Sequence, residues 1–287
     1  MKYLTLAAPA KINLILKVIS RRTDGYHELE TIMHTISLAD RIHVETTPGG
    51  VEVGSNSSDI PADQDNLAYR AAALYMERTG TKAGVKIFIE KNIPVGAGLA
   101  GGSTDAAAVL KALDHLFPAR LAPGELQSMA AVIGSDVAFC LQEGTAIARG
   151  RGELLTPLDD RGPMLDMVLV VPDFQVSTAE VYQAYEVSHD HRNIETAVFV
   201  DAWRNRDITS IASLIYNDLE TVSLNKHKEI GQIKTGLKQA GALNALMSGS
   251  GPAVFGIFID RATAEKAAST MRKSFRQVYQ VTSYYRE

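Results

Sequence analysis

The chain has 287 residues, of which 46% are hydrophobic, and its formal net charge is −4. This length can bury one large core or two of ordinary size, and two packed lobes are favoured. The negative charge offers no broad positive field for the phosphate backbone of DNA or RNA, so nucleic acid is not an expected partner.

Two further features bear on where the protein works. The only cysteine, Cys140, cannot form an internal disulfide, and its apolar neighbours predict a buried thiol, which favours the cytoplasm. Residues 240–259 are uncharged but contain four glycines, Asn244 and Pro252, which is typical of a loop between elements and not of a membrane span. No membrane partner is therefore expected.

The first part of the chain is predicted to be rich in β-strands. Apolar residues alternate along 10–18, which indicates a strand with Lys11 and Asn13 on its other face. A turn is expected at 23–25, followed by Tyr26 and His27, and more strand near 42–46 and 51–54. A helix from residue 67 should stop at Gly80, and a strand is predicted at 85–89.

The next segment places four glycines and two hydroxyl groups before a helix. Residues 94–105 read Pro-Val-Gly-Ala-Gly-Leu-Ala-Gly-Gly-Ser-Thr-Asp, and the helix is expected to open at Ser103 and to run to about residue 116. Backbone amides at a helix N-terminus attract anions, and glycine allows phosphate oxygens to approach closely. The segment therefore predicts a phosphate-binding loop, although a tight strand-to-helix connection would also use one or two glycines.

Two other glycine motifs fit this segment less well. Gly96, Gly98 and Gly101 satisfy the dinucleotide pattern, but the second strand and acidic residue that an NAD-binding oxidoreductase needs do not follow. Gly96 and Gly101 also match part of a Walker A loop, in which Gly102 would occupy the position of the essential lysine. Neither motif is complete.

The remainder of the chain alternates helix and strand patterns. Helices are expected near 125–133, 177–185, 208–217, 230–237 and 262–274, and strands near 166–171, 245–247, 253–259 and 278–283. The polar stretch 188–195 reads as a surface loop whose His189 and His191 lack a third metal ligand. We expect an N-terminal lobe over 1–162 and a C-terminal lobe over 163–287 with a mostly antiparallel sheet, an α+β arrangement.

Three segments in this order resemble the GHMP kinases, a family of ATP-dependent kinases acting on small metabolites: Pro9-Ala-Lys-Ile-Asn-Leu, residues 94–108, and Met247-Ser-Gly-Ser-Gly-Pro. Gly25-Tyr-His-Glu-Leu and Gly134-Ser-Asp-Val are similar to members that phosphorylate a cytidine-diphosphate-linked sugar alcohol. The resemblance implies an α+β, two-lobed GHMP kinase fold with a mixed, β-rich N-terminal lobe that binds ATP and an α/β-sandwich C-terminal lobe.

The resemblance also implies a nucleotide site. The residues implied to wrap ATP are Pro94, Gly96, Gly98, Leu99, Ala100, Gly101, Gly102, Ser103 and Thr104. Mg²⁺ should bridge the phosphates, with the Ser103 hydroxyl as its candidate protein ligand. The turn at 248–251 would brace the cleft, although an ordinary hairpin connection would have the same composition.

Catalysis is implied to rest on Lys11 and Asp136. Phosphoryl transfer to an alcohol needs a carboxylate to take the proton and positive charge near the transferred group. Asp136 would be the proton acceptor and Lys11 the charge that stabilises the transition state. The position of Asp136 after Gly134-Ser135 also suits a helix cap or an ion pair.

Recognition of the acceptor is implied to rest on five residues, namely Asn13, Tyr26, His27, Thr178 and Tyr182. Aromatic rings would stack on cytosine and His27 would hydrogen-bond its polar edge. Plain packing or surface exposure is the alternative for the three rings. A GHMP kinase for another alcohol, such as mevalonate or homoserine, and an ATP-binding homologue without catalysis are the competing functions.

Overall fold

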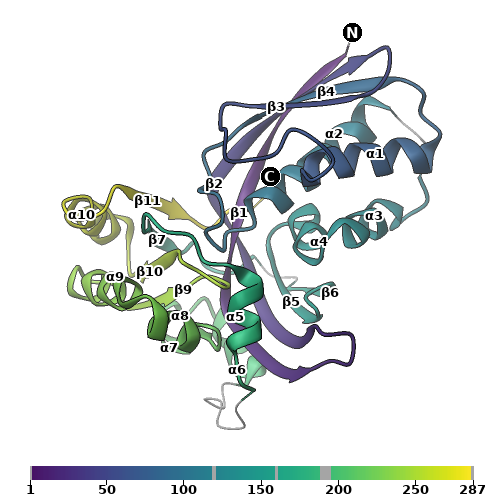
Figure 1. The fold of residues 1–287 in the computed structure, drawn as a ribbon. Coiled ribbons are helices and arrows are strands. Elements are labelled where there is room, and N and C mark those ends of the chain that lie inside the picture. The colour runs from purple at the N-terminus through teal and green to yellow at the C-terminus, as the bar shows by residue number, and fades with distance from the viewer. Residues whose placement is uncertain (1, 118–120, 159–160, 188–194, 286–287) are drawn as a thin grey trace. The chain divides into compact units, whose positions relative to one another are not determined.

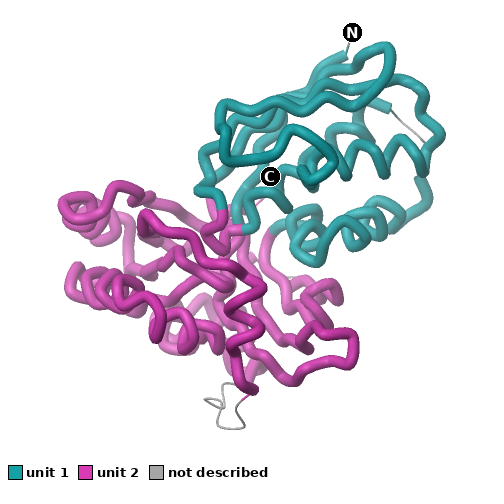
Figure 2. Tube along the Cα trace, viewed as in Figure 1, with its two compact units in different colours: residues 1–10, 38–95, 100–143 teal, residues 11–37, 96–99, 144–287 magenta. Residues whose placement is uncertain are grey.

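The computed structural model describes residues 2–117, 121–158, 161–187 and 195–285. The chain folds into two compact units, which Figure 2 shows in different colours. Unit 1 comprises Met1–Ala10, Leu38–Val95 and Ala100–Glu143, and unit 2 comprises Lys11–Ser37, Gly96–Leu99 and Gly144–Glu287. The long strands β1 (Tyr3–Arg21) and β2 (His27–Thr47) contribute residues to both units. The predicted lobes, 1–162 and 163–287, are each one continuous stretch of the chain, whereas each compact unit is built from three segments. The predicted lobe boundary stays a prediction.

Unit 1 combines strands with a group of packed helices (Figure 1). Strand β3 (Val51–Ser55) runs parallel to β4 (Gly84–Glu90), and β4 pairs antiparallel with residues 41–47 of β2. The helices are α1 (Leu67–Thr79), α2 (Gly101–Leu116), α3 (Glu125–Ile133) and α4 (Ser135–Gln142). Helix α2 packs against α1 and α4, and buried alanines on its faces allow this close approach.

The stop signal predicted for the first helix is confirmed. Helix α1 ends at Thr79, and Gly80 follows with a left-handed φ of 67° while its amide donates to Glu77 and Met76 carbonyls. Glycine adopts this conformation without a steric penalty, so it closes the helix. At the other end the Asn66 side chain accepts a hydrogen bond from the Ala68 amide, as an N-cap residue does.

Unit 2 contains a four-stranded antiparallel sheet in the order β11-β7-β10-β9. These strands are β7 (Asp166–Val171), β9 (Asn244–Met247), β10 (Val254–Phe258) and β11 (Gln277–Thr282). Helices α9 (Lys228–Gln239) and α10 (Arg261–Met271) pack against it (Figure 1). The other elements of this unit are α5 (Thr178–Ala184), α6 (Thr196–Arg204), α7 (Ile208–Leu214), α8 (Glu220–Lys226), β5 (Thr145–Gly150), β6 (Leu154–Pro157) and β8 (Tyr216–Asn217). The predicted α+β arrangement and antiparallel C-terminal sheet are confirmed.

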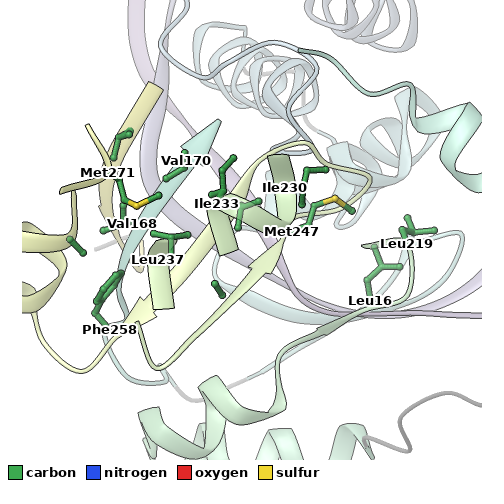
Figure 3. Packing of buried hydrophobic residues seen from close by; sticks show 14 of the residues in the cluster. Leu16, Val168, Val170, Leu219, Ile230, Ile233, Leu237, Met247, Phe258 and Met271 are labelled. Atoms are coloured by element: carbon green, nitrogen blue, oxygen red, sulfur yellow. The ribbon is translucent and has the colours of Figure 1, made fainter. Parts of the chain in front are cut away.

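The core of unit 2 lies between this sheet and its helices, as Figure 3 shows. Val168 and Val170 of β7 and Phe258 of β10 meet Ile233 and Leu237 of α9, and all five side chains are fully buried. Each buried side chain of this size stabilises the fold by about 1.5 to 3 kcal/mol relative to exposure. Leu16 of β1 and Leu219 belong to the same cluster, so β1 is anchored to this core.

The structure corrects the helix predicted over 208–217. Helix α7 ends at Leu214, and Tyr216–Asn217 form β8, which pairs parallel to β1 at Ile15 and Leu16. Pairing with β1 supplies backbone partners that local propensity does not reveal. Helices α6 and α8 were not predicted. His189 and His191 lie outside the described residues.

Two smaller predictions concern Cys140 and the membrane. Cys140 is a buried free cysteine on α4, as predicted. Over the part of the chain that the structure describes, no helix is long and apolar enough to cross a membrane.

His34 on β2 provides a test of how unit 2 is stabilised. Its ring is fully buried, with Nδ1 at 2.7 Å from Thr145 Oγ1 and Nε2 at 2.9 Å from Ser283 Oγ. Burial lowers the pKa of His34 from 6.5 to about 3. Because the unfolded chain binds the proton more tightly, the stability from this group is present above pH 6.5 and is lost as pH falls towards 3.

Between pH 7 and pH 5, His34 takes up a proton mainly in the unfolded chain. We expect this uptake to lower the free energy of unfolding by about 2 kcal/mol. Urea unfolding of the wild type and of His34→Gln at both pH values measures this, since the glutamine keeps polar contacts but does not titrate. The decrease in stability should be smaller in the variant by that amount. Equal decreases in both proteins would show that His34 titrates in the same way folded and unfolded.

Candidate active site

The glycine-rich segment forms a loop that leads directly into α2. Gly96 and Gly98 have left-handed φ values of 70° and 77°, and Ala100 precedes the helix with a φ of 58°. Helix α2 begins at Gly101, so the prediction that it opens at Ser103 is wrong by two residues. The hydrogen bond from the Thr104 amide to the Ala100 carbonyl, 2.9 Å, closes the first turn.

The first turn of α2 suits an anion. The first backbone amides of a helix have no partner within the helix, and those here belong to Gly101, Gly102 and Ser103. Gly102 is exposed, and a methyl group there would have Leu67 Cδ1 at 3.8 Å as its nearest protein atom. This glycine therefore leaves open space on the solvent side of the turn, where a phosphate could approach.

Thr104 and Pro9 bring two of the sequence motifs together within unit 1. Thr104 is buried, and its hydroxyl donates to the Pro9 carbonyl at 2.7 Å. Pro94 also belongs to unit 1 and is partly buried at the start of the loop. The hydroxyl of Thr104 thus ties the first turn of α2 to the strand that carries the first motif.

The three sequence motifs also converge within unit 2. The Lys11 amide donates to the Leu99 carbonyl at 3.1 Å, which joins the first motif to the glycine loop. The Ser248 hydroxyl donates to the Gly98 carbonyl at 3.1 Å, which joins the third motif to the same loop. A methyl group at Gly98 would overlap the carbonyl oxygen of Ser248, so close packing requires glycine at this position.

Lys11 is held by a chain of polar contacts on β1. It is buried, and its Nζ donates to Asn13 Oδ1 at 2.8 Å. The Asn13 Nδ2 donates to Thr31 Oγ1 at 2.8 Å, and the Thr31 hydroxyl donates to the Ile15 carbonyl. Lys11 and Asn13 share one face of the strand, as their spacing predicts, and this network gives the ammonium group a defined position.

Asp136 lies in unit 1, in the first turn of α4. The cap position of this helix is Gly134, so Asp136 is not the capping residue. A carboxylate in a first turn is stabilised by the helix dipole. Lys11 belongs to unit 2, and the pairing of these two residues stays a prediction.

The five residues predicted to recognise the acceptor all belong to unit 2. The His27 ring lies 5.3 Å from the Tyr182 ring at an interplanar angle of 31°, and Tyr26 is exposed with the Arg151 guanidinium 5.0 Å above its ring. Thr178 Oγ1 lies 2.8 Å from Ser250 Oγ of the glycine turn. Two rings and a hydroxyl are thus brought to one part of the fold although residues 27 and 178 lie far apart in the sequence.

The protonation state of His27 suits hydrogen bonding. Partial burial lowers the pKa of His27, and the positive charge of Arg21 lowers it further. The ring is therefore neutral at neutral pH, with one nitrogen as a donor and the other as an acceptor. This is the capability that recognition of a base edge requires.

A buried ionic cluster beneath the glycine loop was not predicted. Lys91 forms ion pairs with Asp40 and, at 3.0 Å, with Asp105, while Asp40 Oδ1 accepts from the Ile93 amide at 2.8 Å. A methyl group at Gly101 would come 3.1 Å from Lys91 Nζ, so this cluster explains the glycine there. Burial raises the pKa of Asp105 to about 8; the nearby Asp40 carboxyl group adds to the rise, and the Lys91 ammonium group opposes it.

A signal for this cluster exists in the sequence. Asp105 stands at the start of a run of alanines, and Lys91 follows directly after an alternating apolar strand. Charged residues in such apolar positions are rarely buried unless they are paired. Their partners could not be identified, because Asp40 comes from a third, distant segment.

The described residues contain no group of three or more histidine, cysteine, aspartate or glutamate side chains that could hold a metal ion. Mg²⁺ in phosphoryl-transfer sites is held mainly by the phosphates and by one or two protein oxygens. The donor set near the glycine loop fits that pattern, since Ser103 offers one partly exposed hydroxyl in the first turn of α2.

Comparison with known proteins identifies the class. The family model described as the GHMP kinases N terminal domain matches residues 66–144, and the GHMP kinases C terminal model matches residues 199–277. The 4-diphosphocytidyl-2-C-methyl-D-erythritol kinase of Syntrophomonas wolfei is 51% identical over 280 residues, which cover 97% of this chain and 98% of that one. The kinase of the same name from Shouchella clausii is 44% identical, with 98% and 94% covered.

Solved structures agree with these matches. A crystal structure of 4-(cytidine 5'-diphospho)-2C-methyl-D-erythritol kinase superposes with a TM-score of 0.85 at 37% identity, covering 98% of this chain and all of that one. Homoserine kinase from Cytophaga hutchinsonii, at 20% identity and a TM-score of 0.77 over 99% and 95% of the two chains, shares the fold. Fold and sequence thus define a small-molecule kinase that uses ATP as phosphate donor and an alcohol group as acceptor. The chain belongs to the GHMP kinases.

Proposed function

We propose that this enzyme transfers the γ-phosphoryl group of ATP to a hydroxyl of 4-diphosphocytidyl-2-C-methyl-D-erythritol. The product would be the 2-phosphate, an intermediate of non-mevalonate isoprenoid precursor biosynthesis. The observation that carries the proposal is 51% identity over 97% of the chain to a kinase of that name. The cytoplasm is the expected location, which the single buried thiol supports.

In this proposal the glycine loop and the first turn of α2 bind the phosphates of ATP. The first-turn amides of Gly101, Gly102 and Ser103 and the helix dipole supply the attraction. The Ser103 hydroxyl is the candidate protein ligand of Mg²⁺. The ion would neutralise charge on the phosphates, as such reactions generally require.

Lys11 and Asp136 have separate roles in the proposed transfer. The carboxylate of Asp136 accepts the proton of the acceptor hydroxyl late in the transfer, through a loose transition state. The ammonium group of Lys11 stabilises charge that develops on the transferred group. Its bond to Asn13 fixes the ammonium before the substrate arrives, so little reorganisation is needed during the reaction.

The cytidine diphosphate part of the acceptor is assigned to Tyr26, His27 and Tyr182, with Asn13 and Thr178 completing the set. Stacking on the exposed ring of Tyr26 and the partly buried ring of Tyr182 supplies affinity, and the neutral His27 ring supplies hydrogen bonds to the base edge. The His27–Tyr182 ring contact supports a shared role for these two side chains.

The test of this assignment is competition by nucleotides. CDP should inhibit competitively with the acceptor, and UDP should inhibit about tenfold to hundredfold more weakly, because uracil places an acceptor where cytosine has an amino donor. Each buried group left unpaired costs roughly 1 to 3 kcal/mol. Inhibition constants for both nucleotides at fixed ATP provide the measurement.

Tyr26→Ala tests the proposed stacking on cytosine. Tyr69→Ala on α1 is the control, because it removes the same side chain outside the proposed acceptor site. CDP binding should weaken by roughly 1 to 3 kcal/mol in the first and stay unchanged in the second, while ATP affinity is constant in both. Equal inhibition by CDP and UDP would contradict the cytosine site and leave the kinase class intact.

A further inference from the structure

The stretch from the end of β8 into the first turn of α8, residues 217–223, carries an unusual set of buried polar side chains. Asn217, Glu220 and Ser223 are at most 9% exposed, yet none of them belongs to the predicted site. Buried polar groups are retained only where their hydrogen bonds are satisfied. Their partners therefore show what this segment does.

Asn217 binds the glycine turn at two points. Its Nδ2 donates to the carbonyl oxygens of Met247 and Gly249, both at 2.8 Å, and its Oδ1 accepts from the Leu219 amide at 3.0 Å. Both amide hydrogens are thus used on the two carbonyls that flank Ser248. Only one orientation of the amide satisfies all three bonds, so the contact is specific.

Two neighbours of Asn217 reinforce this contact. Glu220 Oε1 accepts from the Met247 amide at 2.9 Å, and its other oxygen pairs with Lys234. The Ser223 hydroxyl donates to the Ser250 carbonyl at 3.3 Å. The turn at 248–251 is therefore fixed along its whole length by side chains from one segment.

The turn at 248–251 also contacts residues of the proposed site within unit 2. Ser248 binds the Gly98 carbonyl, and Ser250 binds Thr178. The same segment also holds β1, because the Asp218 amide donates to the Leu16 carbonyl and Asp218 Oδ2 accepts from the Val18 amide. A single short stretch thus fixes both the strand that carries Lys11 and the turn that supports the glycine loop.

We propose that Asn217 is a positioning residue for phosphoryl transfer, which acts by holding the turn at 248–251 and, through Ser248, residues 96–99 of the glycine loop. The proposal rests on the assignment of that loop and Lys11 to the proposed function. In this role Asn217 acts through the turn and not by touching ATP or the acceptor. Misplacement of a reacting group by about 1 Å can cost a factor on the order of a hundred in rate, so loss of this contact should affect turnover.

Asn217→Asp and Asn217→Ala remove both donated hydrogen bonds, and only the first adds a charge. The matched control is Asn244→Asp, on the same strand as Met247, where Asn244 Nδ2 donates to the Ala212 carbonyl at 2.8 Å. We expect kcat to fall about tenfold to hundredfold in both Asn217 variants, with the KM for ATP changed less than about threefold. The control should keep the wild-type kcat even if its Tm falls.

Hydrogen–deuterium exchange gives a readout that does not depend on the acceptor. The Ser248 amide donates to the Ala253 carbonyl and the Gly251 amide to the Ser248 carbonyl, both at 2.9 Å. Peptides covering 247–254 should exchange faster in the two Asn217 variants and not in the control. If the wild type did not phosphorylate the proposed acceptor, the substrate assignment would be wrong. Hydrogen–deuterium exchange would still show whether Asn217 holds the turn at 248–251.

Two results would overturn the proposal itself. Wild-type kcat in folded Asn217→Ala would show that the contact does not position the site. Failure of both Asn217 variants to fold, with Asn244→Asp folded, would make Asn217 a residue of stability alone.

Discussion

Asp136→Asn should lower kcat by roughly a hundredfold or more and leave ATP binding and folding nearly unchanged. An amide has almost the shape of the carboxylate but cannot accept the proton of the acceptor hydroxyl. The residue is partly exposed in the first turn of α4, so the substitution creates no cavity. Initial rates at saturating substrates, with ATP affinity from calorimetry, measure both effects.

The control for this substitution is Glu125→Gln, which removes an acidic group from the first turn of the neighbouring helix α3. It should change stability by a few tenths of a kcal/mol, as expected for a helix-dipole contact, and leave kcat unchanged. If Asp136→Asn behaved like Glu125→Gln, Asp136 would serve only to stabilise its helix.

Gly102→Val and Gly98→Ala should both abolish activity. The first should do so by blocking ATP binding, and the second by destabilising the fold. Gly102 is exposed in the first turn of α2, and a Cβ atom there would make only an ordinary contact with Leu67. The variant should fold normally and lose ATP binding, because the side chain would occupy the space where the phosphates approach. Its backbone has no left-handed φ, so the substitution brings no left-handed strain.

Gly98→Ala should instead destabilise the protein. The left-handed φ of 77° costs roughly 1 kcal/mol for alanine, and overlap with the Ser248 carbonyl oxygen adds roughly 1 to 3 kcal/mol. Thermal unfolding and calorimetry with ATP separate the two variants. A folded Gly102→Val with wild-type ATP affinity would place the nucleotide elsewhere.

The glycine loop and the Lys11–Asn13 face could be predicted because their signals are local. Alternation of apolar residues fixes which side chains share a strand face, and glycines before an alanine-rich helix are typical of an anion site. The start of α2 was displaced by two residues, because glycine is a poor helix former and local propensity alone disfavours a helix that begins Gly101-Gly102. In the structure Ala100 takes the left-handed conformation just before the helix, and Lys91 Nζ leaves little room for a side chain at residue 101.

Features that depend on distant pairing could not be predicted. Asp40, Lys91 and Asp105 come from a strand, a strand end and a helix that meet only in the folded chain. The contact of Asn217 with the turn depends on the register of β8 against β1, whereas the local pattern around Asn217 predicts a helix. Long-range contacts of this kind leave no periodic signal in a single sequence.

The identity of the phosphorylated product tests the proposed function. Purified enzyme should be incubated with ATP, Mg²⁺ and 4-diphosphocytidyl-2-C-methyl-D-erythritol, and in parallel with mevalonate and with homoserine, and followed by ³¹P NMR. The proposed function requires one ADP for each new phosphomonoester, formed only with the cytidine-linked alcohol and lost in Asp136→Asn. Phosphorylation of mevalonate or homoserine with none of the cytidine-linked alcohol would contradict it.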